Sequence, residues 1–459
     1  MSTRRISSVV KVGSLLIGGD NPIRVQSMTT TNTNDTEACV EQSKRIIDAG
    51  GELVRLTTQG RREAENMKNI SEELKRQGYN QPLVADVHFN ANVADVAALY
   101  CEKVRVNPGN YVDPARKFIK QEYTDEEYAQ ELQKIDDRFT PFLNICKEHY
   151  TAIRIGVNHG SLSDRIRNRY GDTPEGIVES CMEFLRICKR EDFNNVVLSI
   201  KASNTVVMVK SVRLLVEAMD KEDMHYPLHL GVTEAGEGED GRIKSAVGIG
   251  ALLTEGIGDT IRVSLSEEPE CEIPVARKLV SFIPECSKMR EEAVIENDTL
   301  TLAFNEDNDD DLALKASMTA GAILIDGKAH ELHITNKGKE QPELAASILQ
   351  AARVKFTKTE YISCPGCGRT LYNLQGTIAK IKSAISQAAK DNPRFNTLKI
   401  GIMGCIVNGP GEMADADYGY VGAGPNKISL YKGQECIEKS IPEDEAVDKL
   451  ISFIIDDNK

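Results

Sequence analysis

Eight short runs rich in β-branched residues recur along the first 280 residues of the chain, and longer stretches with apolar residues at helical spacing separate them. Strands that alternate with helices indicate a parallel sheet, and eight is the number that closes a barrel. An open doubly wound sheet is the alternative, but no GxGxxG follows an early strand to support its dinucleotide-binding form. We therefore predict an α/β chain with an N-terminal (β/α)8 TIM-type barrel over residues 1–282. Its strands are expected at residues 23–28, 53–57, 83–88, 103–108, 152–158, 196–203, 228–234 and 260–265.

Cations recur at equivalent places in these runs, although a strand interior is an expensive place for a charge. Only Asp86 and Glu234 stand out as carboxylates that could neutralise them. Because a barrel of this type forms its active site at the carboxyl ends of the strands, the excess positive charge predicts a site for a small polyanion such as a phosphate or diphosphate. The strand cations are Arg24, Arg55, Arg105, Arg154, Lys201 and Arg262, and the same ends carry Asn158 and Ser264.

Two acidic positions near these strand ends could take part in chemistry. Asp86 and His88 are two residues apart, so both side chains can point to the same face of a strand. Such a pair can bind a metal ion or orient a substrate hydroxyl. Glu234 lies in a glycine-rich acidic loop, where it is either a solvated loop residue or an acid at the mouth of the barrel.

The composition excludes several classes of protein. The chain has 56 basic and 70 acidic residues and a net charge of −14, which disfavours a general nucleic-acid or membrane-surface binder. No run approaches the roughly 18 apolar residues that span a membrane. The start of the chain does not read as a signal peptide, and its 11 cysteines do not read as a disulfide framework. We expect a cytoplasmic protein.

Three cysteines near the C-terminus form a pattern of their own. Cys364 and Cys367 make a CxxC, and Cys405 follows a strand-like run and precedes a Gly-Pro turn. The nearest further ligand is Glu412, seven residues beyond Cys405. Structural zinc sites are usually closed by four Cys or His ligands, whereas three thiolates and one weak oxygen ligand favour a cubane iron–sulfur cluster with a labile iron. Zinc and buried structural cysteines remain alternatives at this point.

Sequence motifs at both ends of the chain, in order, identify a known family. They are NPIRVQSMT, LVRLT, VADVHF, VRVNPGN, IRIGVNHGSL, LSIKAS, HLGVTEAG, IRVSLSEEP, CPGC and GCIVNGPGEMADADYGYVG. With them the chain resembles the 4-hydroxy-3-methylbut-2-en-1-yl diphosphate synthases, iron–sulfur enzymes of the non-mevalonate isoprenoid pathway. The resemblance covers about the first 280 and the last 100 residues.

The resemblance implies a substrate, a cofactor and an electron source. The substrate is 2-C-methyl-D-erythritol 2,4-cyclodiphosphate, which two one-electron reductions through a [4Fe-4S] cluster convert to (E)-4-hydroxy-3-methylbut-2-enyl diphosphate. The chain has no flavin or nicotinamide motif, so a flavodoxin or ferredoxin is the implied donor. A homodimer is also implied, because in compact family members the cluster domain of one subunit caps the barrel of its partner. In the large form of the family the cap closes within one chain, and the sequence leaves both arrangements open.

The resemblance also assigns roles to residues. The cluster ligands would be Cys364, Cys367, Cys405 and a displaceable Glu412. Glu234 would be the acid that protonates the departing oxygen, with Asp86 and His88 near it. The substrate diphosphate would bind to Arg55, Arg105, Arg154, Asn158, Lys201, Arg262 and Ser264.

The chain departs from the compact form of the family in its middle. Residues 283–355 form an insert with an acidic run at 305–311, which we expect to be a solvated loop, and the insert would be a reduced form of a larger third domain. Residues 356–459 are expected to be an α+β cluster domain. Two other functions stay open: a zinc-dependent barrel hydrolase or lyase acting on a phosphorylated sugar, and a non-catalytic iron–sulfur sensor.

Overall fold

The eight central strands close into a barrel, as the alternating pattern predicts. The computed structural model describes residues 4–114, 122–370, 372–407 and 409–457. The strands are all parallel in the order β8-β7-β6-β5-β4-β3-β10-β9, and a bridge between Leu198 and Leu228 joins the two edges of this sheet. They are β3 (Arg24–Met28), β4 (Leu53–Thr58), β5 (Leu83–Val87), β6 (Lys103–Val106), β7 (Ala152–Asn158), β8 (Val196–Lys201), β9 (His229–Leu230) and β10 (Thr260–Ile261). The predicted fold class is confirmed.

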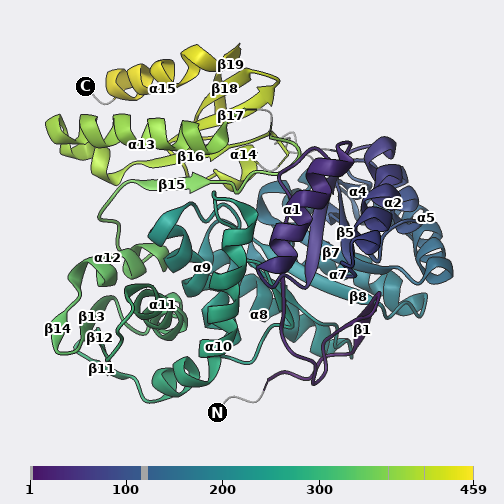
Figure 1. Ribbon diagram of the computed structural model, residues 1–459, viewed down its shortest axis with the longest axis horizontal. Coiled ribbons are helices and arrows are strands. Elements are labelled where there is room, and N and C mark those ends of the chain that lie inside the picture. Colours follow the sequence, from purple (N-terminus) through teal and green to yellow (C-terminus); the bar gives the residue numbers. More distant parts are fainter. Residues whose placement is uncertain (1–3, 115–121, 371, 408, 458–459) are drawn as a thin grey trace.

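Helices surround this barrel (Figure 1). Side-chain caps fix where several of them begin: Asp35 caps α1, and Thr124 with Glu127 forms a capping box on α5. The long helices are α1 (Thr36–Asp48), α2 (Arg61–Arg76), α3 (Ala91–Ala98), α5 (Asp125–His149), α7 (Pro174–Arg190), α8 (Thr205–Lys221), α9 (Gly238–Leu253) and α10 (Glu272–Glu291). The short ones are α4 (Pro108–Tyr111), η1 (His159–Ser161), α6 (Asp164–Tyr170) and η2 (Pro269–Cys271).

An N-terminal hairpin plugs the lower end of the barrel. Its strands β1 (Val10–Val12) and β2 (Leu15–Ile17) are antiparallel. Val10, Val12 and Ile17 are fully buried and form one apolar cluster with residues at the starts of four barrel strands: Leu53, Val84, Ala152 and Val197. Because this end is sealed with apolar side chains, the opposite end, where the strands finish, is the open mouth.

The two last barrel strands are shorter than the sequence suggests. The runs at 228–234 and 260–265 contribute only the two-residue strands β9 and β10 to the ladder. Beyond β9 the chain turns away through Gly231 and reaches Glu234, which has a left-handed backbone (φ 49°). The residues expected at the ends of these strands therefore lie on loops at the mouth.

The central segment folds as a small α/β unit against the barrel. Its sheet has the order β11-β12-β13-β14, built from β11 (Val294–Glu296), β12 (Thr299–Phe304), β13 (Glu331–Asn336) and β14 (Lys339–Glu340). Helix α11 (Asp309–Ile325) connects the parallel pair β12 and β13, and α12 (Pro342–Ala351) follows β14. Helices α9 and α11 lie side by side (Figure 1), and Gly250 and Gly321 allow their close approach, because a Cβ on Gly321 would lie 2.6 Å from the Val247 carbonyl oxygen.

Two features of this segment differ from the expectation. The acidic run is not simply a solvated loop, since Asp309, Asp310 and Asp311 form the first turn of α11, where acidic side chains complement the helix dipole. Helix α10 also runs through residue 282, where we expected the barrel domain to end.

The C-terminal domain is an α+β unit with one five-stranded sheet, ordered β15-β16-β17-β18-β19. The first three strands are parallel and the last two antiparallel. They are β15 (Glu360–Ser363), β16 (Lys399–Met403), β17 (Tyr418–Gly424), β18 (Lys427–Lys432) and β19 (Glu435–Pro442). Helices α13 (Leu374–Asp391) and α15 (Glu443–Asp457) pack together on the sheet, and η3 (Pro393–Thr397) and the short α14 (Gly409–Glu412) complete the domain. Within the part of the chain that the structure describes, none of the helices combines the length and the apolar character needed to cross a membrane.

Candidate active site

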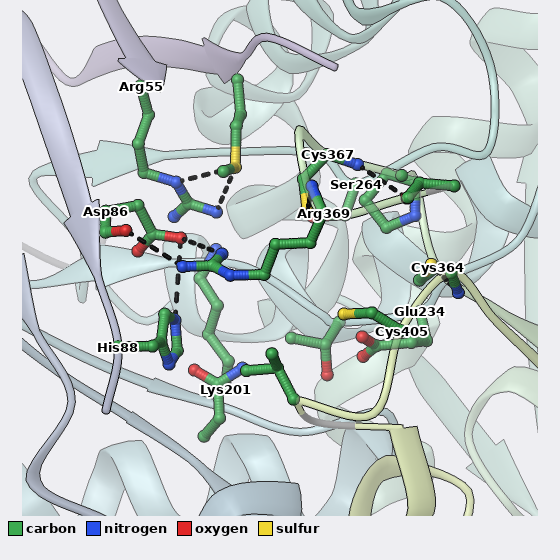
Figure 2. A pocket seen from close by; sticks show the side chains of 18 of the residues that line it. Arg55, Asp86, His88, Lys201, Glu234, Ser264, Cys364, Cys367, Arg369 and Cys405 are labelled. Atoms are coloured by element: carbon green, nitrogen blue, oxygen red, sulfur yellow. Dashed lines mark hydrogen bonds and ion pairs between the residues drawn. The ribbon is translucent and has the colours of Figure 1, made fainter. Parts of the chain in front are cut away.

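A cavity of about 100 Å³ lies between the mouth of the barrel and the C-terminal domain of the same chain. In Figure 2 the barrel residues Arg55, Asp86 and His88 lie on one side, and Cys364 and Cys405 face them from the other. The barrel contributes Met28, Arg55, Asp86, His88, Arg105, Arg154, Asn158, Lys201, Thr233, Glu234, Arg262 and Ser264. The C-terminal domain contributes Cys364, Cys367, Arg369, Thr370, Met403, Cys405 and Val407 among others. Except for Arg24 and Glu412, every residue that the sequence singles out for the site lines this cavity. Arg24 lies at the start of β3, at the opposite end of the strand from the mouth, and forms an ion pair of 2.8 Å with Glu52.

Parallel pairing brings the charged side chains of the barrel together. Asp86 on β5 pairs with Arg105 on β6, which in turn pairs with Arg154 on β7. Residues paired across a parallel sheet point to the same face, and here that face is the barrel interior. Four residues further along β7, Asn158 pairs with Lys201 on β8. The alternation of side chains along the strands therefore explains why these residues share one cavity.

Some of these cations are held by partners inside the protein. Arg105 donates to Asp86 Oδ1 at 3.0 Å and to Asn158 Oδ1 at 2.8 Å. Arg262 forms two hydrogen bonds of 2.9 Å with the carboxylate of Glu272 at the start of α10. Burial would raise the pKa of Asp86, but Arg55 and Arg105 hold that pKa well below its usual range. These groups are fixed in place without any ligand.

Arg154 differs from Arg105 and Arg262. Its side chain is 2 % exposed, and neither Nε nor Nη1 has a hydrogen-bond partner in the described part of the chain. Burial, with repulsion from Arg55 and Arg105, lowers its pKa well below the usual value, and Lys201 is shifted in the same direction mainly by burial and Arg154. A buried cation without a counter-charge is costly, so an anionic ligand in this cavity would relieve that cost.

Asp86 and His88 are placed to hold Arg105 rather than a metal ion. His88 contacts the Arg105 guanidinium, and its other ring nitrogen lies 3.2 Å from Asn110 Nδ2. Burial and the charge of Arg105 lower the pKa of His88 to about 3, so the ring is neutral at physiological pH. A neutral imidazole here can orient a polar group but does not supply a proton.

Glu234 has the properties of a general acid. Its backbone has a positive φ of 49°, an uncommon conformation for a residue with a side chain. The carboxyl is buried, and Oε2 has no hydrogen-bond partner among the described residues. Burial, followed by the nearby Glu412, raises its pKa to about 8, so it is a neutral carboxylic acid at pH 7.

The three cysteines reach the cavity from two neighbouring parallel strands. Cys364 directly follows β15 and Cys405 lies two residues beyond β16, so the carboxyl ends of both strands meet at the mouth of the barrel. Ser266 of the barrel fixes the first loop by donating to the Cys364 carbonyl oxygen at 2.9 Å. The sulfur of Cys364 accepts from the Gly404 N–H at 3.2 Å, and the sulfur of Cys367 accepts from the Arg369 N–H at 3.4 Å.

This donor set fits an iron–sulfur cubane. Among the residues that the structure describes, no three His, Cys, Asp or Glu side chains are close enough to hold a single metal ion. A [4Fe-4S] cluster needs a different arrangement, because each thiolate ligates its own iron atom. All eleven cysteines are free thiols, and backbone N–H groups directed at the sulfurs are a feature that tunes such clusters.

The structure places Glu412 away from the cysteines' cavity. Its carboxylate is buried against the barrel and accepts from Gly160 N at 3.2 Å, Ser203 N at 3.0 Å and Thr233 Oγ1 at 2.9 Å. Of the four ligands that the resemblance implies, the structure brings the three cysteines together and leaves Glu412 bound to the barrel.

Sequence reasoning missed three residues of the site. Arg369 lines the cavity, lies 3.7 Å from the Asp86 carboxylate and donates to the Asp86 carbonyl oxygen at 3.3 Å. The sulfur of Met28 accepts from Arg55 at 2.9 and 3.0 Å, and Glu272 is the counter-ion of Arg262. Arg369 lies two residues beyond the CPGC motif, and like the partners Met28 and Glu272 it carries no local signal of its role.

A buried cationic barrel mouth that is covered by a cysteine-bearing domain defines an iron–sulfur protein acting on a small phosphorylated ligand. The comparisons then give the family. Residues 7–277 match the GcpE TIM-barrel domain, and residues 360–456 match the GcpE protein C-terminal domain. The chain therefore belongs to the GcpE family, whose cofactor is a [4Fe-4S] cluster.

Two curated relatives illustrate the similarity. The chain is 50% identical to the 4-hydroxy-3-methylbut-2-en-1-yl diphosphate synthase (flavodoxin) of Bacteroides thetaiotaomicron, over 99% of this chain and 98% of that protein. It is 44% identical to the protein of the same name from Porphyromonas gingivalis, over 98% of this chain and 97% of that protein. The first alignment covers 609 positions against the 459 residues of this chain, so that relative carries residues with no counterpart here.

Proposed function

We propose that the chain is an oxidoreductase that converts 2-C-methyl-D-erythritol 2,4-cyclodiphosphate to (E)-4-hydroxy-3-methylbut-2-enyl diphosphate. The observation that carries the proposal is one cavity in which the buried cations of the barrel face three thiols, and in which Nε and Nη1 of Arg154 have no hydrogen-bond partner among the described residues. The family and the names of the relatives support the same reaction. The [4Fe-4S] cluster would be held by Cys364, Cys367, Cys405 and a displaceable Glu412, and when bound it supplies the two electrons of the reaction one at a time.

The residues of the barrel would do the remaining work. Arg154 and Lys201 would neutralise the diphosphate, because both are buried cations that line the cavity, and Nε and Nη1 of Arg154 have no hydrogen-bond partner among the described residues. Arg55, Arg105, Arg262, Asn158 and Ser264 would complete the site, and Asp86 with His88 would hold Arg105 in position. A hydroxyl leaves readily only as water, so Glu234, which is neutral below about pH 8, would supply the proton to the departing oxygen.

A flavodoxin is the electron donor in the names of the relatives, and we propose the same class of donor here, with ferredoxin as the alternative. The eleven free thiols are consistent with the cytoplasm as the compartment. The resemblance implies a homodimer, but both walls of the cavity come from one chain, so we propose one chain as the catalytic unit. For the central segment, we propose that residues 283–355 are a reduced third domain that supports the C-terminal domain.

The test begins with iron and acid-labile sulfide in protein purified without oxygen. We expect about four of each per chain, and turnover of the cyclodiphosphate by the reduced protein to an allylic diphosphate detected by mass spectrometry. Zinc without sulfide would instead indicate a barrel hydrolase or lyase. A cluster that forms, with substrate binding but without turnover, would indicate a sensor, and either result would overturn the proposal.

A further inference from the structure

Arg369 belongs to the C-terminal domain, but its side chain reaches the barrel. Its guanidinium donates to the Asp86 carbonyl oxygen at 3.3 Å and lies 3.7 Å from Asp86 Oδ2. The side chain is 8 % exposed and lines the cavity, and Figure 2 shows it extending from the cysteine side toward Asp86. Among the described residues, the other arginine and lysine side chains that line the cavity come from the barrel. Arg369 is therefore the cation that the C-terminal domain contributes.

The contacts of Arg369 are looser than those of the barrel arginines. Arg105 is held by hydrogen bonds of 2.8 and 3.0 Å, and Arg262 by two of 2.9 Å. Among the described residues the guanidinium of Arg369 makes one hydrogen bond, of 3.3 Å, because 3.7 Å to the carboxylate exceeds hydrogen-bond length. An arginine has five N–H donors, so most of those of Arg369 are left for a ligand in the cavity.

Asp86 does not neutralise Arg369 by itself. Its carboxylate already accepts from Arg105 at 3.0 Å, so the two arginines share one negative charge. Burial lowers the pKa of Arg105, and the positive charge of Arg369 lowers it further. An anion between the two guanidinium groups would relieve their repulsion. A phosphoryl group suits this place, because its oxygens accept two parallel hydrogen bonds from an arginine.

The backbone of Arg369 is part of the turn that carries Cys367. The Arg369 N–H donates to the Cys367 sulfur at 3.4 Å. The turn lies close against the barrel at Gly368, where an added Cβ would lie 2.7 Å from the Thr31 carbonyl oxygen. Because the side chain of Arg369 reaches the anion site and its backbone contacts the sulfur, a ligand that binds this side chain also restrains the turn.

We propose that Arg369 is a further substrate-binding residue, which binds a phosphoryl group of the diphosphate from the cysteine side and thereby holds the turn of Cys367 against the substrate. This inference rests on the proposed diphosphate site of the barrel. It gives Arg369 two tasks: the side chain adds affinity, and the backbone passes the restraint on to Cys367. Both tasks use the arrangement of the two domains that the structure shows.

The first test measures affinity in protein purified without oxygen and kept without a reductant, so that no turnover takes place. Inorganic pyrophosphate and the cyclodiphosphate are the probes, and calorimetry gives their affinities. Arg369→Met is expected to weaken binding of both about tenfold or more, the loss for hydrogen bonds to a charged group. Arg369→Lys keeps the charge without the planar fork and should lose less.

Arg394→Met is the matched control for this measurement, because Arg394 is an exposed arginine of the same domain that does not line the cavity. Its affinity for both probes should equal that of the wild type. Unchanged affinity of Arg369→Met, or an equal loss in Arg394→Met, would overturn the proposal.

The second test examines whether binding is passed on to Cys367. Saturating pyrophosphate should slow hydrogen–deuterium exchange in the peptide of residues 364–370 in the wild type but not in Arg369→Met. A barrel peptide that contains Lys201 should be slowed in both proteins, which shows that the anion is bound in both. Equal slowing of the 364–370 peptide in the two proteins would overturn the role of Arg369 in holding the turn.

The third test separates this inference from the proposed function. In turnover assays Arg369→Met should raise KM about tenfold or more, while its iron and sulfide content stays that of the wild type. A variant that loses the cluster yet binds pyrophosphate as the wild type does would show that Arg369 supports only the cluster, which overturns the proposal. Absence of turnover in the wild type would contradict the proposed function instead. Calorimetry and exchange would still report on Arg369, so the two failures are distinguishable.

Discussion

The two walls of the cavity obtain their geometry in different ways. On the barrel wall, strand pairing and internal partners fix the side chains, as in the bonds of Arg105 to Asp86 and Asn158. On the opposite wall, the cysteines lie on loops after β15 and β16, and the structure gives their sulfurs only backbone N–H partners. Much of the barrel wall is thus held by partners within the protein, whereas we expect the cysteine wall to take its final geometry from the cluster.

This difference suggests a division of labour. A rigid barrel can present charge to an anion at little cost on binding, since its groups are already ordered. The cysteine loops contribute only ligands for a group that imposes its own geometry. Damage to one wall should therefore leave the other almost intact, and the variants below test that separation.

The largest effect is expected for Cys405→Ser on the cysteine wall. Loss of one of three thiolates should abolish the cluster and the activity, while the barrel keeps its fold and its affinity for the cyclodiphosphate. The measurements are iron and sulfide content, turnover, and binding by calorimetry. Cluster content close to that of the wild type would show that Cys405 is not a ligand.

The next effect concerns Glu234, which lies on the barrel wall and whose Oε2 has no hydrogen-bond partner in the part of the chain that the structure describes. We propose its acid form as the proton donor, and its pKa is raised to about 8, so turnover should fall as the pH rises through about 8. Glu234→Gln should lower kcat by about 10²–10⁴-fold, leave substrate affinity largely unchanged and remove this limb of the pH profile. If turnover of Glu234→Gln still falls as the pH rises through about 8, the titration of another group causes the fall.

Particular residues show how far the sequence determines this site. The inward positions of Arg55, Arg105 and Arg154 follow from the alternation of side chains along strands, and the fold class follows from eight strand–helix repeats. The partners Glu272 and Arg369 could not be predicted in the same way, since each meets its counterpart only after the chain has folded.

The failures at the sequence level have similar causes. The two-residue strands β9 and β10 end early because the chain turns at the mouth, which no local pattern records. The acidic run was predicted only in part: residues 305–308 form an exposed loop, but Asp309, Asp310 and Asp311 begin α11. Acidic charges are equally typical of a loop and of a helix N-terminus. The position of Glu412 depends on how two domains meet, and the roles of all these site residues stay predictions until variants are measured.

Arg154 and Arg105 allow the sharpest comparison within the barrel wall. Arg154→Met should weaken binding of the cyclodiphosphate about 100-fold yet stabilise the ligand-free protein, because it removes a buried cation without a partner. Arg105→Met should also weaken binding of the cyclodiphosphate. It should lower the free energy of unfolding by roughly 3–5 kcal/mol, because the buried Asp86 carboxylate loses the hydrogen bond from Arg105. Denaturant unfolding and calorimetry measure both quantities, and equal stability of the two variants would remove the distinction between paired and unpaired cations.

The smallest effect is expected for Gly156→Ala, because Gly156 has no side chain and leaves space for a cation of the barrel wall. A Cβ on Gly156 would lie 2.6 Å from Arg105 Nε, so Gly156→Ala should displace this guanidinium without removing it. A shift of one hydrogen-bonded cation should weaken substrate binding by about threefold to tenfold, and the variant should keep a full cluster. Gly424→Ala is the control, because the nearest atom to its added Cβ is 4.0 Å away. If Gly156→Ala binds substrate as tightly as the wild type does, the Arg105 side chain can move without loss of affinity. The barrel wall would then be less rigid than we infer from its contrast with the cysteine loops.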